Sequence, residues 1–192
     1  MLDLAAGAGG KALALAAQMR NEGEIVARDI DERRLAQISD RAKRAGVTII
    51  LASSSNAMVF DRVLVDAPCS GTGTWRRQPE LRWRLTPKRL EALKKMQAQL
   101  LDDGARQTRP GGRLIYVTCS ILPSENEDQI TTFLERHPDF AMRPARGVWA
   151  ESIGTEPPGM DEFFRATPFT TGTDGFFAAV LARSRRAQVP PE

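Results

Sequence analysis

Two cysteines, each placed directly after an apolar run, are the residues of this chain best suited to chemistry. Cys69 follows RVLV in the sequence Asp66-Ala67-Pro68-Cys69, and Cys119 follows RLIYV in the sequence Thr118-Cys119-Ser120. A single cysteine is more often a small buried apolar residue than a nucleophile. Two cysteines at the ends of successive predicted strands, each next to a serine, instead favour a pair of reactive thiols.

The rest of the chain offers these thiols few partners for the commoner cysteine chemistries. A hydrolytic serine or cysteine nucleophile needs a base, yet the one histidine, His137, lies at the end of a predicted helix just before Pro138. One histidine and two cysteines also argue against a Cys/His zinc site, which takes four ligands. The sequence therefore disfavours a hydrolase and predicts no metal.

A glycine-rich turn near the start of the chain indicates a cofactor. Ala5–Lys11 reads AAGAGGK between a predicted strand and a predicted helix, and Asp29 stands twenty residues after Gly9. An acid at that distance binds a ribose hydroxyl in dinucleotide-binding folds. Ala12 breaks both the phosphate-loop pattern and a strict G-x-G-x-x-G. The pattern predicts an adenosine-containing cofactor and leaves NAD, FAD and S-adenosylmethionine open, with a purely structural turn as the alternative.

The elements that must position these residues alternate along the chain. Apolar or β-branched strands are separated by amphipathic or Ala/Leu-rich helices, which is typical of a mostly parallel sheet covered by helices. The predicted strands are residues 1–5, 23–29, 47–52, 60–67, 112–120 and a last one within 172–184, and the predicted helices are 10–21, 31–46, 86–109 and 124–138.

Proline, glycine and capping residues indicate where some of these elements begin and end. Pro110 and Gly111 are expected to stop the third helix, and a capping box of Ser124 and Glu127 to open the fourth. Residues 144–161 are rich in Pro and Gly and are predicted to be an irregular connection. Ligands of such folds bind beyond the carboxyl ends of the strands. We therefore predict a doubly wound α/β fold in which the two cysteine loops face one cleft.

Methylation at C5 of a pyrimidine is a reaction that uses two thiols, an acid and an adenosine cofactor without a histidine. C5 is too weak a nucleophile to take a methyl group directly. A thiolate that adds to C6 pushes electron density onto C5, and an acid near N3 and N4 of cytosine stabilises the adduct. After the transfer the C5 proton must leave and the thiol must be expelled, which a second cysteine can assist.

A basic segment follows the first cysteine. Residues 76–113 hold eleven Lys and Arg against four Asp and Glu, a balance of +7, whereas the whole chain carries a formal net charge of +3. Arginine supplies phosphate contacts and tryptophan a face on which bases stack, so we predict nucleic-acid binding through Arg76, Arg77, Trp75 and Trp83. A solvated helix face with two structural tryptophans is the alternative interpretation.

The composition bounds the class of protein. A chain of 192 residues with 42% hydrophobic residues can bury one sizeable core, so we expect a single domain. No apolar run approaches the roughly 18–20 residues that span a bilayer, and the first residues lack the pattern of a signal peptide. Two cysteines cannot form a disulfide framework, which indicates a reducing, cytoplasmic location without membrane contact.

Three stretches of the chain carry a family resemblance: DAPCSGTG from Asp66, VTCSILPSENED from Val117 and GTDGFFAAVL from Gly172. They resemble the motifs of the Sun/NSUN family of RNA 5-methylcytosine methyltransferases, most closely its bacterial branch, which acts on ribosomal RNA. The similarity covers nearly the whole chain and implies a class I S-adenosylmethionine-dependent methyltransferase fold. It implies that Cys119 is the nucleophile, that Cys69 helps to release the product, and that Asp66 holds the cytosine and borders the cofactor.

The resemblance also implies a cofactor site and a substrate. Asp29 corresponds to the ribose-binding acid, and ribosomal RNA is the expected substrate, with transfer RNA as the alternative. The family usually reads Cys-Ala-Ala-Pro-Gly-Gly-Lys-Thr at the first turn, from which Ala5, Gly7, Ala8 and Ala12 depart. The residues expected to wrap the methionine part of S-adenosylmethionine are Ala5, Ala6, Gly7, Ala8, Gly9, Gly10 and Lys11.

Two further departures concern the adenine site and the chain length. The family has an aspartate on the loop after the third strand, where this chain offers Ser53, Ser54, Ser55 and Asn56, so the residue that contacts adenine is not predicted. We expect residues 1–184 to form a catalytic domain that is shorter at its amino end than in the family, and 185–192 to be a frayed tail.

Three alternatives to this prediction stay open. A nucleotide-cofactor oxidoreductase would leave the two cysteine motifs unexplained. A non-catalytic RNA-binding remnant would keep the fold without turnover. Within the methyltransferase reaction itself, Cys69 rather than Cys119 could be the nucleophile.

Overall fold

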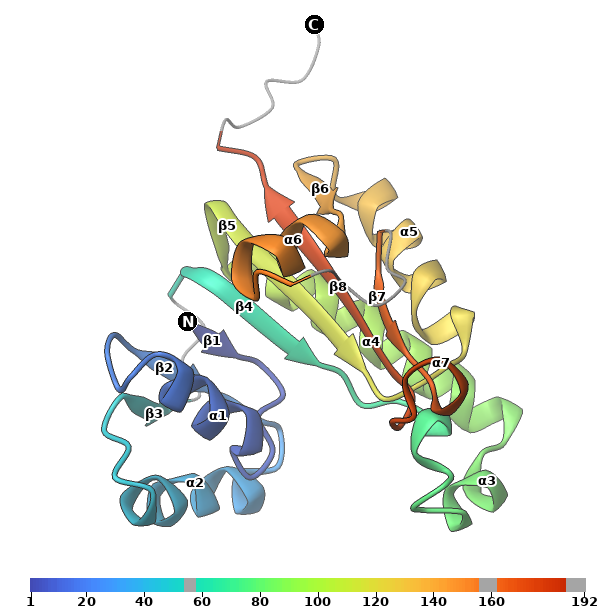
Figure 1. The fold of residues 1–192 in the computed structure, drawn as a ribbon, viewed down its shortest axis with the longest axis horizontal. Helices are drawn as coiled ribbons and strands as arrows, with labels where there is room; N and C mark the ends of the chain where they lie inside the picture. Colours follow the sequence, from blue (N-terminus) through green and yellow to red (C-terminus); the bar gives the residue numbers. More distant parts are fainter. Residues whose placement is uncertain (54–57, 156–161, 186–192) are drawn as a thin grey trace, which may run out of the picture.

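One eight-stranded sheet organises the computed structural model, which describes residues 1–53, 58–155 and 162–185 (Figure 1). The strand order is β3-β2-β1-β4-β5-β8-β6, with β7 paired to β8. Strands β1 to β5 pair in parallel, and β8 runs antiparallel to its neighbours β5, β6 and β7. The mostly parallel sheet predicted from the sequence is confirmed. The strands are β1 (Leu2–Asp3), β2 (Ile25–Ala27), β3 (Ile50–Ala52), β4 (Phe60–Asp66), β5 (Thr108–Thr118), β6 (Phe140–Arg143), β7 (Phe164–Ala166) and β8 (Phe176–Arg183).

Helices cover both faces of the sheet. In Figure 1, α1 and α6 lie in front of the sheet, and α4 and α5 lie behind it. None of the helices within the described ranges is long and apolar enough to cross a membrane. The helices are α1 (Gly10–Gln18), α2 (Glu32–Arg44), α3 (Glu80–Arg84), α4 (Pro87–Gln107), α5 (Glu127–Arg136), α6 (Ala145–Ser152) and α7 (Pro168–Thr171), with single 3-10 turns η1 (Thr72–Thr74) and η2 (Pro123–Glu125).

The ends of α2 and α4 follow from their terminal residues. Asp31 caps α2 by accepting hydrogen bonds from the backbone N–H groups of its first turn, and Gly46 follows the helix with φ of +66°. Thr86 caps α4 in the same way, and Pro87 occupies the first helical position, where no N–H donor is needed. These caps set where each helix starts relative to the strand end before it.

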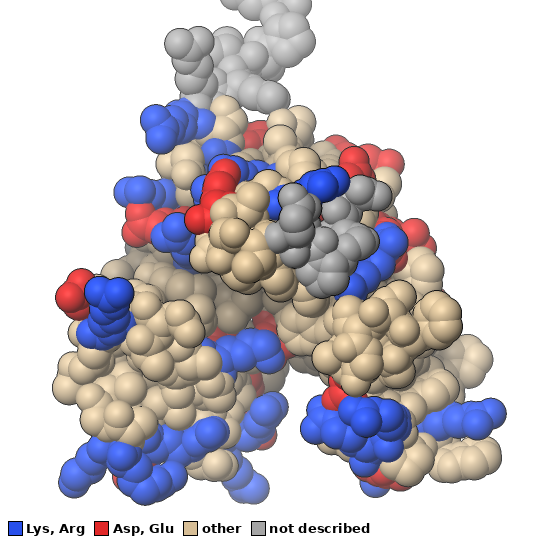
Figure 2. Space-filling view, in the orientation of Figure 1, with Lys and Arg blue, Asp and Glu red and all other residues tan. Residues whose placement is uncertain are grey.

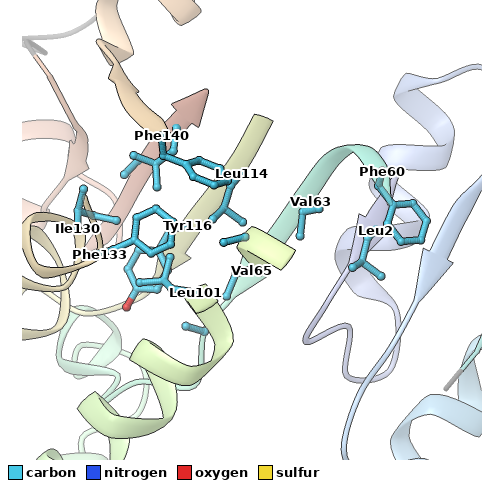
Figure 3. Close-up of a cluster of buried hydrophobic side chains, with 14 of the residues drawn as sticks. Leu2, Phe60, Val63, Val65, Leu101, Leu114, Tyr116, Ile130, Phe133 and Phe140 are labelled. Atoms are coloured by element: carbon cyan, nitrogen blue, oxygen red, sulfur yellow. The ribbon is translucent and has the colours of Figure 1, made fainter. Parts of the chain in front are cut away.

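The main hydrophobic core lies between the sheet and helices α4 and α5. Figure 3 shows Leu101, Tyr116 and Phe133 close together in this core, each with at most 1% of its surface exposed. Burial of each such side chain contributes about 1.5–3 kcal/mol to the stability of the fold. The core therefore fixes the end of β5, where Cys119 follows, against the two helices.

The boundary between α4 and β5 differs from the prediction. The helix ends at Gln107, and β5 begins at Thr108, before Pro110 and Gly111 rather than after them. The register shifts in this part of the β4–β5 pair, and Gly111 has φ of +77°. The Pro-Gly pair thus marks an irregularity inside the strand rather than the end of the helix.

The predicted capping box at the start of α5 is wrong. The helix begins at Glu127, and its N-cap residue is Asn126, without a side-chain hydrogen bond to the helix. The Asn126 side chain instead accepts a hydrogen bond from Thr118 Oγ1 at 2.6 Å and donates one to the Ser120 carbonyl at 3.0 Å. Asn126 therefore bonds to the Cys119 loop rather than capping α5 with its side chain.

The predicted irregular connection 144–161 is also partly wrong, because it contains α6. Trp149 of α6 stacks on Phe164 of β7, with ring centroids 6.0 Å apart. Residues 156–161, the loop residues Ser54, Ser55 and Asn56, and residues 186–192 of the predicted tail lie outside the described part of the chain. The division into a domain of 1–184 and a tail stays a prediction.

Candidate active site

A cavity of about 650 Å³ opens at the carboxyl ends of the central strands. It lies where the strand order reverses between β1 and β4, which is where ligands of doubly wound folds bind. The structure brings together five of the predicted site residues around it: Ala5 after β1, Asp29 after β2, Asp66 and Cys69 at the end of β4, and Cys119 after β5. Its size lies within the range typical of pockets for small ligands and cofactors.

The two thiols are in direct contact at the floor of this arrangement. Cys69 Sγ and Cys119 Sγ lie 3.3 Å apart, and both side chains are half-buried. A hydrogen bond from the Cys69 thiol lowers the pKa of Cys119 to about 7. The same bond, together with burial, raises the pKa of Cys69 far above its usual value. The two sulfurs are therefore coupled, and their contact favours a pair of one thiolate and one thiol, with the lower pKa on Cys119.

A lysine and two aspartates lie on the β1 side of the thiols. Lys11 Nζ forms an ion pair with Asp66 Oδ2, although the two residues are 55 positions apart in the sequence. Asp3 lies near both and is fully buried; the Ala12 N–H lies close enough to lower its pKa slightly, but neither carboxylate oxygen makes a hydrogen bond of normal geometry among the described residues. Burial, reinforced by the charge of Asp66, raises the pKa of Asp3 to about 7. Sequence reasoning missed Asp3, although an acid inside the apolar run MLDLA is a visible signal.

The glycine-rich turn takes a shape that side chains would obstruct. Gly7 and Gly9 have φ of +56° and +80°, in the left-handed region that favours glycine. A Cβ atom at Gly9 would lie 2.8 Å from Ile38 Cγ1 of α2. The Gly7 N–H donates to Asp29 Oδ2 at 2.6 Å, so the predicted ribose acid also holds the turn. The second oxygen of Asp29 accepts from the Asp31 N–H at 2.8 Å.

The predicted turn residues do not all reach the cavity. Ala5 lines it, Lys11 reaches Asp66, and Ala6, Gly7, Ala8, Gly9 and Gly10 form the backbone between them. Ile30, which sequence reasoning missed, also lines the cavity and is fully exposed. A large exposed apolar side chain at a cavity rim suits the flat face of a heterocycle. The signal available in the sequence was its position directly after Asp29.

The basic segment borders the cavity through η1 and α3. Figure 2 shows the surface hollowed between the part formed by α1 and α2 and the part formed by α3, with Lys and Arg on both sides of the hollow. Trp83 is 80% exposed, whereas Trp75 is half-buried. Arg76 and Arg77 are exposed, and both form ion pairs with Asp174. That acid lies almost a hundred positions along the chain and offsets part of the segment's charge.

The model of the family described as 16S rRNA methyltransferase RsmB/F matches residues 1–182. The chain belongs to this family.

Individual relatives agree with the family model. Ribosomal RNA small subunit methyltransferase B from Salmonella paratyphi B is 38% identical over 191 residues, which cover 95% of this chain and 42% of that protein. The crystal structure of PH0851 aligns with a TM-score of 0.81 and 40% identity, over 94% of this chain and 41% of that one. NSun6 from Pyrococcus horikoshii, solved with SFG, aligns with a TM-score of 0.80 and 29% identity, over 97% and 48% of the two chains. This chain spans less than half the length of these relatives.

The comparisons confirm the predicted family and the predicted fold class. The fold is that of the class I S-adenosylmethionine-dependent methyltransferases, as its structural neighbours show. The histidine of this RsmB/F family chain does not line the cavity: His137 stacks on Phe133 in the α5 region, and its Nε2 atom lies 2.8 Å from Asp102 Oδ1. The titratable groups at the cavity are therefore the two thiols, several carboxylates and the Arg34 guanidinium, with Lys11 paired to Asp66.

Proposed function

We propose that this RsmB/F family chain is the catalytic part of an S-adenosylmethionine-dependent methyltransferase that forms 5-methylcytosine in ribosomal RNA. The observation that carries the proposal is the pair of thiols 3.3 Å apart beside Asp66 in the cavity. The similar proteins support it, because one is called ribosomal RNA small subunit methyltransferase B and another was solved with SFG, an S-adenosylmethionine analogue. Residues 1–184 are proposed as the catalytic domain.

The residues around the β1–β2 side of the cavity fit the cofactor. When bound, S-adenosylmethionine supplies the methyl group. Asp29 has a carboxylate that can accept from ribose hydroxyls, and Ile30 offers an apolar face for adenine. Ala5 and the turn Ala6–Lys11 would lie along the methionine part, where Gly7 and Gly9 keep the backbone free of side chains.

Cys119 begins the proposed reaction. Its thiolate adds to C6 of cytosine, and the electron pair of the C5–C6 double bond becomes available at C5 with charge shared to N3. The Asp66 carboxylate is placed to accept a hydrogen bond from the N4 amino group, and the Lys11 ammonium paired with it supplies positive charge for the negative charge that develops at N3. A pKa of about 7 for Cys119 gives a large thiolate fraction at neutral pH, which is what a nucleophilic thiol needs.

Cys69 is assigned to the release step. After the methyl group is on C5, the C5 proton passes to water in the open cavity, its bonding pair re-forms the C5–C6 double bond, and the C6–S bond breaks to expel the Cys119 thiolate. Cys69 touches Cys119, so it can donate a hydrogen bond to the departing thiolate. Cys119 is taken as the nucleophile because the family resemblance implies it.

The RNA is proposed to lie over η1 and α3, where Arg76, Arg77, Trp75 and Trp83 would contact phosphates and bases. Trp83 is the most available of the four for stacking, because it is 80% exposed. Transfer RNA is the second candidate substrate, and the cytoplasm is the proposed location.

The proposal is tested by incubating the chain with S-adenosylmethionine carrying a labelled methyl group and 16S ribosomal RNA, and by detecting nucleosides by mass spectrometry. Transfer RNA is the comparison substrate, and Cys119→Ser is the control variant. Labelled 5-methylcytosine in ribosomal RNA, absent with Cys119→Ser, is the expected result. Binding of S-adenosylmethionine and RNA without any labelled 5-methylcytosine would make the chain the non-catalytic remnant instead.

A further inference from the structure

A buried carboxylate joins the two loops that carry the thiols. Glu125, in η2, has none of its surface exposed. Its Oε1 atom accepts hydrogen bonds from the Ser70 N–H at 2.9 Å and from Gln97 Nε2 at 3.0 Å, and its Oε2 atom accepts one from Ser70 Oγ. Ser70 directly follows Cys69, so two of these three bonds hold the residue next to a thiol.

The other loop is tied to the same centre. The Tyr116 hydroxyl donates to the Glu125 carbonyl at 2.7 Å, which fixes η2 to the strand that leads into Cys119. Ser120, directly after Cys119, has its Oγ 3.3 Å from Ser70 Oγ and 3.1 Å from Thr72 Oγ1. The residue after each cysteine therefore belongs to one buried hydrogen-bonded network with Glu125 at its centre.

Gln97 of α4 also holds the Cys69 loop in place. Gln97, whose surface is fully buried, shares its Nε2 group between Glu125 and the Pro68 carbonyl, which lies 2.9 Å away. Pro68 and Ser70 flank Cys69 in the chain, so both neighbours of this thiol are held by the same Glu125–Gln97 pair. A buried carboxylate with no hydrogen bonds would be strongly destabilising, which makes the three donors a requirement of this arrangement.

Charged groups on both sides act on the thiol pair. The negative charge of Glu125 raises the pKa of Cys69, in addition to the larger effects of the Cys119 hydrogen bond and burial. On the other side, Asp66 raises the pKa of Cys119, and Lys11 lowers it to a smaller extent. The Gly71 N–H lowers the pKa of Cys69. Glu125 is thus a charge that disfavours a thiolate on Cys69.

We propose that Glu125 is a positioning residue for the two thiols. It holds both cysteine loops at the distance at which the sulfurs touch, and its charge disfavours a thiolate on Cys69. The catalytic use of the thiols rests on the proposed methyltransferase function. The effect of Glu125 on the thiols does not depend on that function and can be measured without RNA.

The test separates the charge of Glu125 from its hydrogen bonds. Glu125→Gln keeps an oxygen for the Ser70 N–H and Gln97, and its amide group can donate to Ser70 Oγ, which is able to reverse its role. The charge is lost while the network is kept. Asp128→Asn is the matched control, because it removes the same charge from an exposed residue of α5.

The readout is the pH dependence of alkylation of Cys69 by iodoacetamide in a Cys119→Ser background. The Glu125→Gln change is expected to lower the midpoint by about one pH unit, the scale of a lost like-charge neighbour, and Asp128→Asn to leave it in place. A midpoint that stays unchanged or rises in Glu125→Gln would overturn the proposal. Circular dichroism at each pH verifies that every variant is folded.

A second readout uses methyl transfer in the background with both cysteines. Glu125→Ala, which removes the acceptors that hold the cysteine loops, should lower kcat by about tenfold or more through misplacement of the thiols, whereas Glu125→Gln, which keeps the hydrogen bonds, should leave kcat and KM for RNA close to the parent values. Equal kcat values for Glu125→Ala and the parent would overturn the positioning role. If the parent chain transfers no methyl group, the proposed function fails, and the alkylation midpoint still decides whether Glu125 controls Cys69.

Discussion

Replacement of Asp3 by asparagine should stabilise the protein, and increasingly so as the pH rises. Asp3 is fully buried without a hydrogen bond of normal geometry among the described residues, and its pKa is raised from 3.8 to about 7 by burial and by Asp66. The folded protein therefore binds this proton more tightly than the unfolded chain does. The resulting stabilisation is complete below the unfolded pKa and is lost as the pH rises to about 7.

The size of the effect follows from the two pKa values. A difference of about three pKa units corresponds to about 4 kcal/mol at 1.36 kcal/mol per unit. About 1.5 kcal/mol of this is already lost at pH 5, where aspartate is ionised in the unfolded chain, so about 2.5 kcal/mol remains to be lost between pH 5 and pH 8. Asparagine has a similar shape and no charge to bury, so Asp3→Asn avoids this loss.

The assay is urea unfolding followed by tryptophan fluorescence at pH 5 and at pH 8. The difference in free energy of unfolding between Asp3→Asn and the parent should grow by about 2.5 kcal/mol over this range. Asp40→Asn, which removes the same charge from an exposed position on α2, should show a constant difference. If the Asp3→Asn difference is also constant, Asp3 is ionised in the folded state at pH 5, and the account of a strained buried carboxyl is wrong.

Three further predictions concern the cofactor, the RNA and the packing of the nucleophile loop. Asp29→Ala should weaken S-adenosylmethionine binding about ten- to a hundredfold in calorimetry, the cost of a lost charge-assisted hydrogen bond; unchanged affinity would place the cofactor elsewhere. Joint replacement of Arg76 and Arg77 by alanine should flatten the salt dependence of RNA binding by about one to two units of slope, and an unchanged slope would leave both arginines as partners of Asp174 only. Gly73→Ala should cost about 1–3 kcal/mol of stability, because a Cβ atom there would lie 2.7 Å from the Cys119 carbonyl oxygen. Gly147→Ala is the control, because a Cβ atom there would meet nothing within 4 Å among the described residues outside its own helix backbone and chain neighbours. Equal melting temperatures for the two variants would contradict the close packing.

The arrangement of the cavity could be predicted because it depends on strand ends. Asp29, Asp66 and Cys119 each follow an apolar run, and a parallel sheet brings the carboxyl ends of its strands to one edge. The chemistry of the two cysteines could be predicted from their residue types and from the family resemblance.

What the sequence did not reveal depends on contacts between distant residues. Ser124 and Glu127 have the spacing of a capping box, but Asn126 and Glu125 bond to the cysteine loops instead, and no local pattern predicts that preference. The ion pairs of Arg77 with Asp174 and of Lys11 with Asp66 join residues 97 and 55 positions apart.

The connection after β6 was missed for a different reason. Helix α6 is short, and its predicted segment holds several Pro and Gly residues, so the apolar period is brief. Trp149 is held in position by stacking on Phe164, which lies fifteen residues further along the sequence. Tertiary packing of this kind overrides weak local propensity.

The measurement that tests the central claim most directly is the covalent adduct between the protein and RNA on a denaturing gel. Cys69→Ala should still attack and methylate cytosine but release the product slowly, so a slow-migrating adduct should accumulate with ribosomal RNA and S-adenosylmethionine. Cys119→Ala, and the double variant, should form no adduct while still binding the cofactor. An adduct trapped in Cys119→Ala and absent from Cys69→Ala would contradict the choice of nucleophile, and the absence of any adduct from every variant would contradict the covalent mechanism.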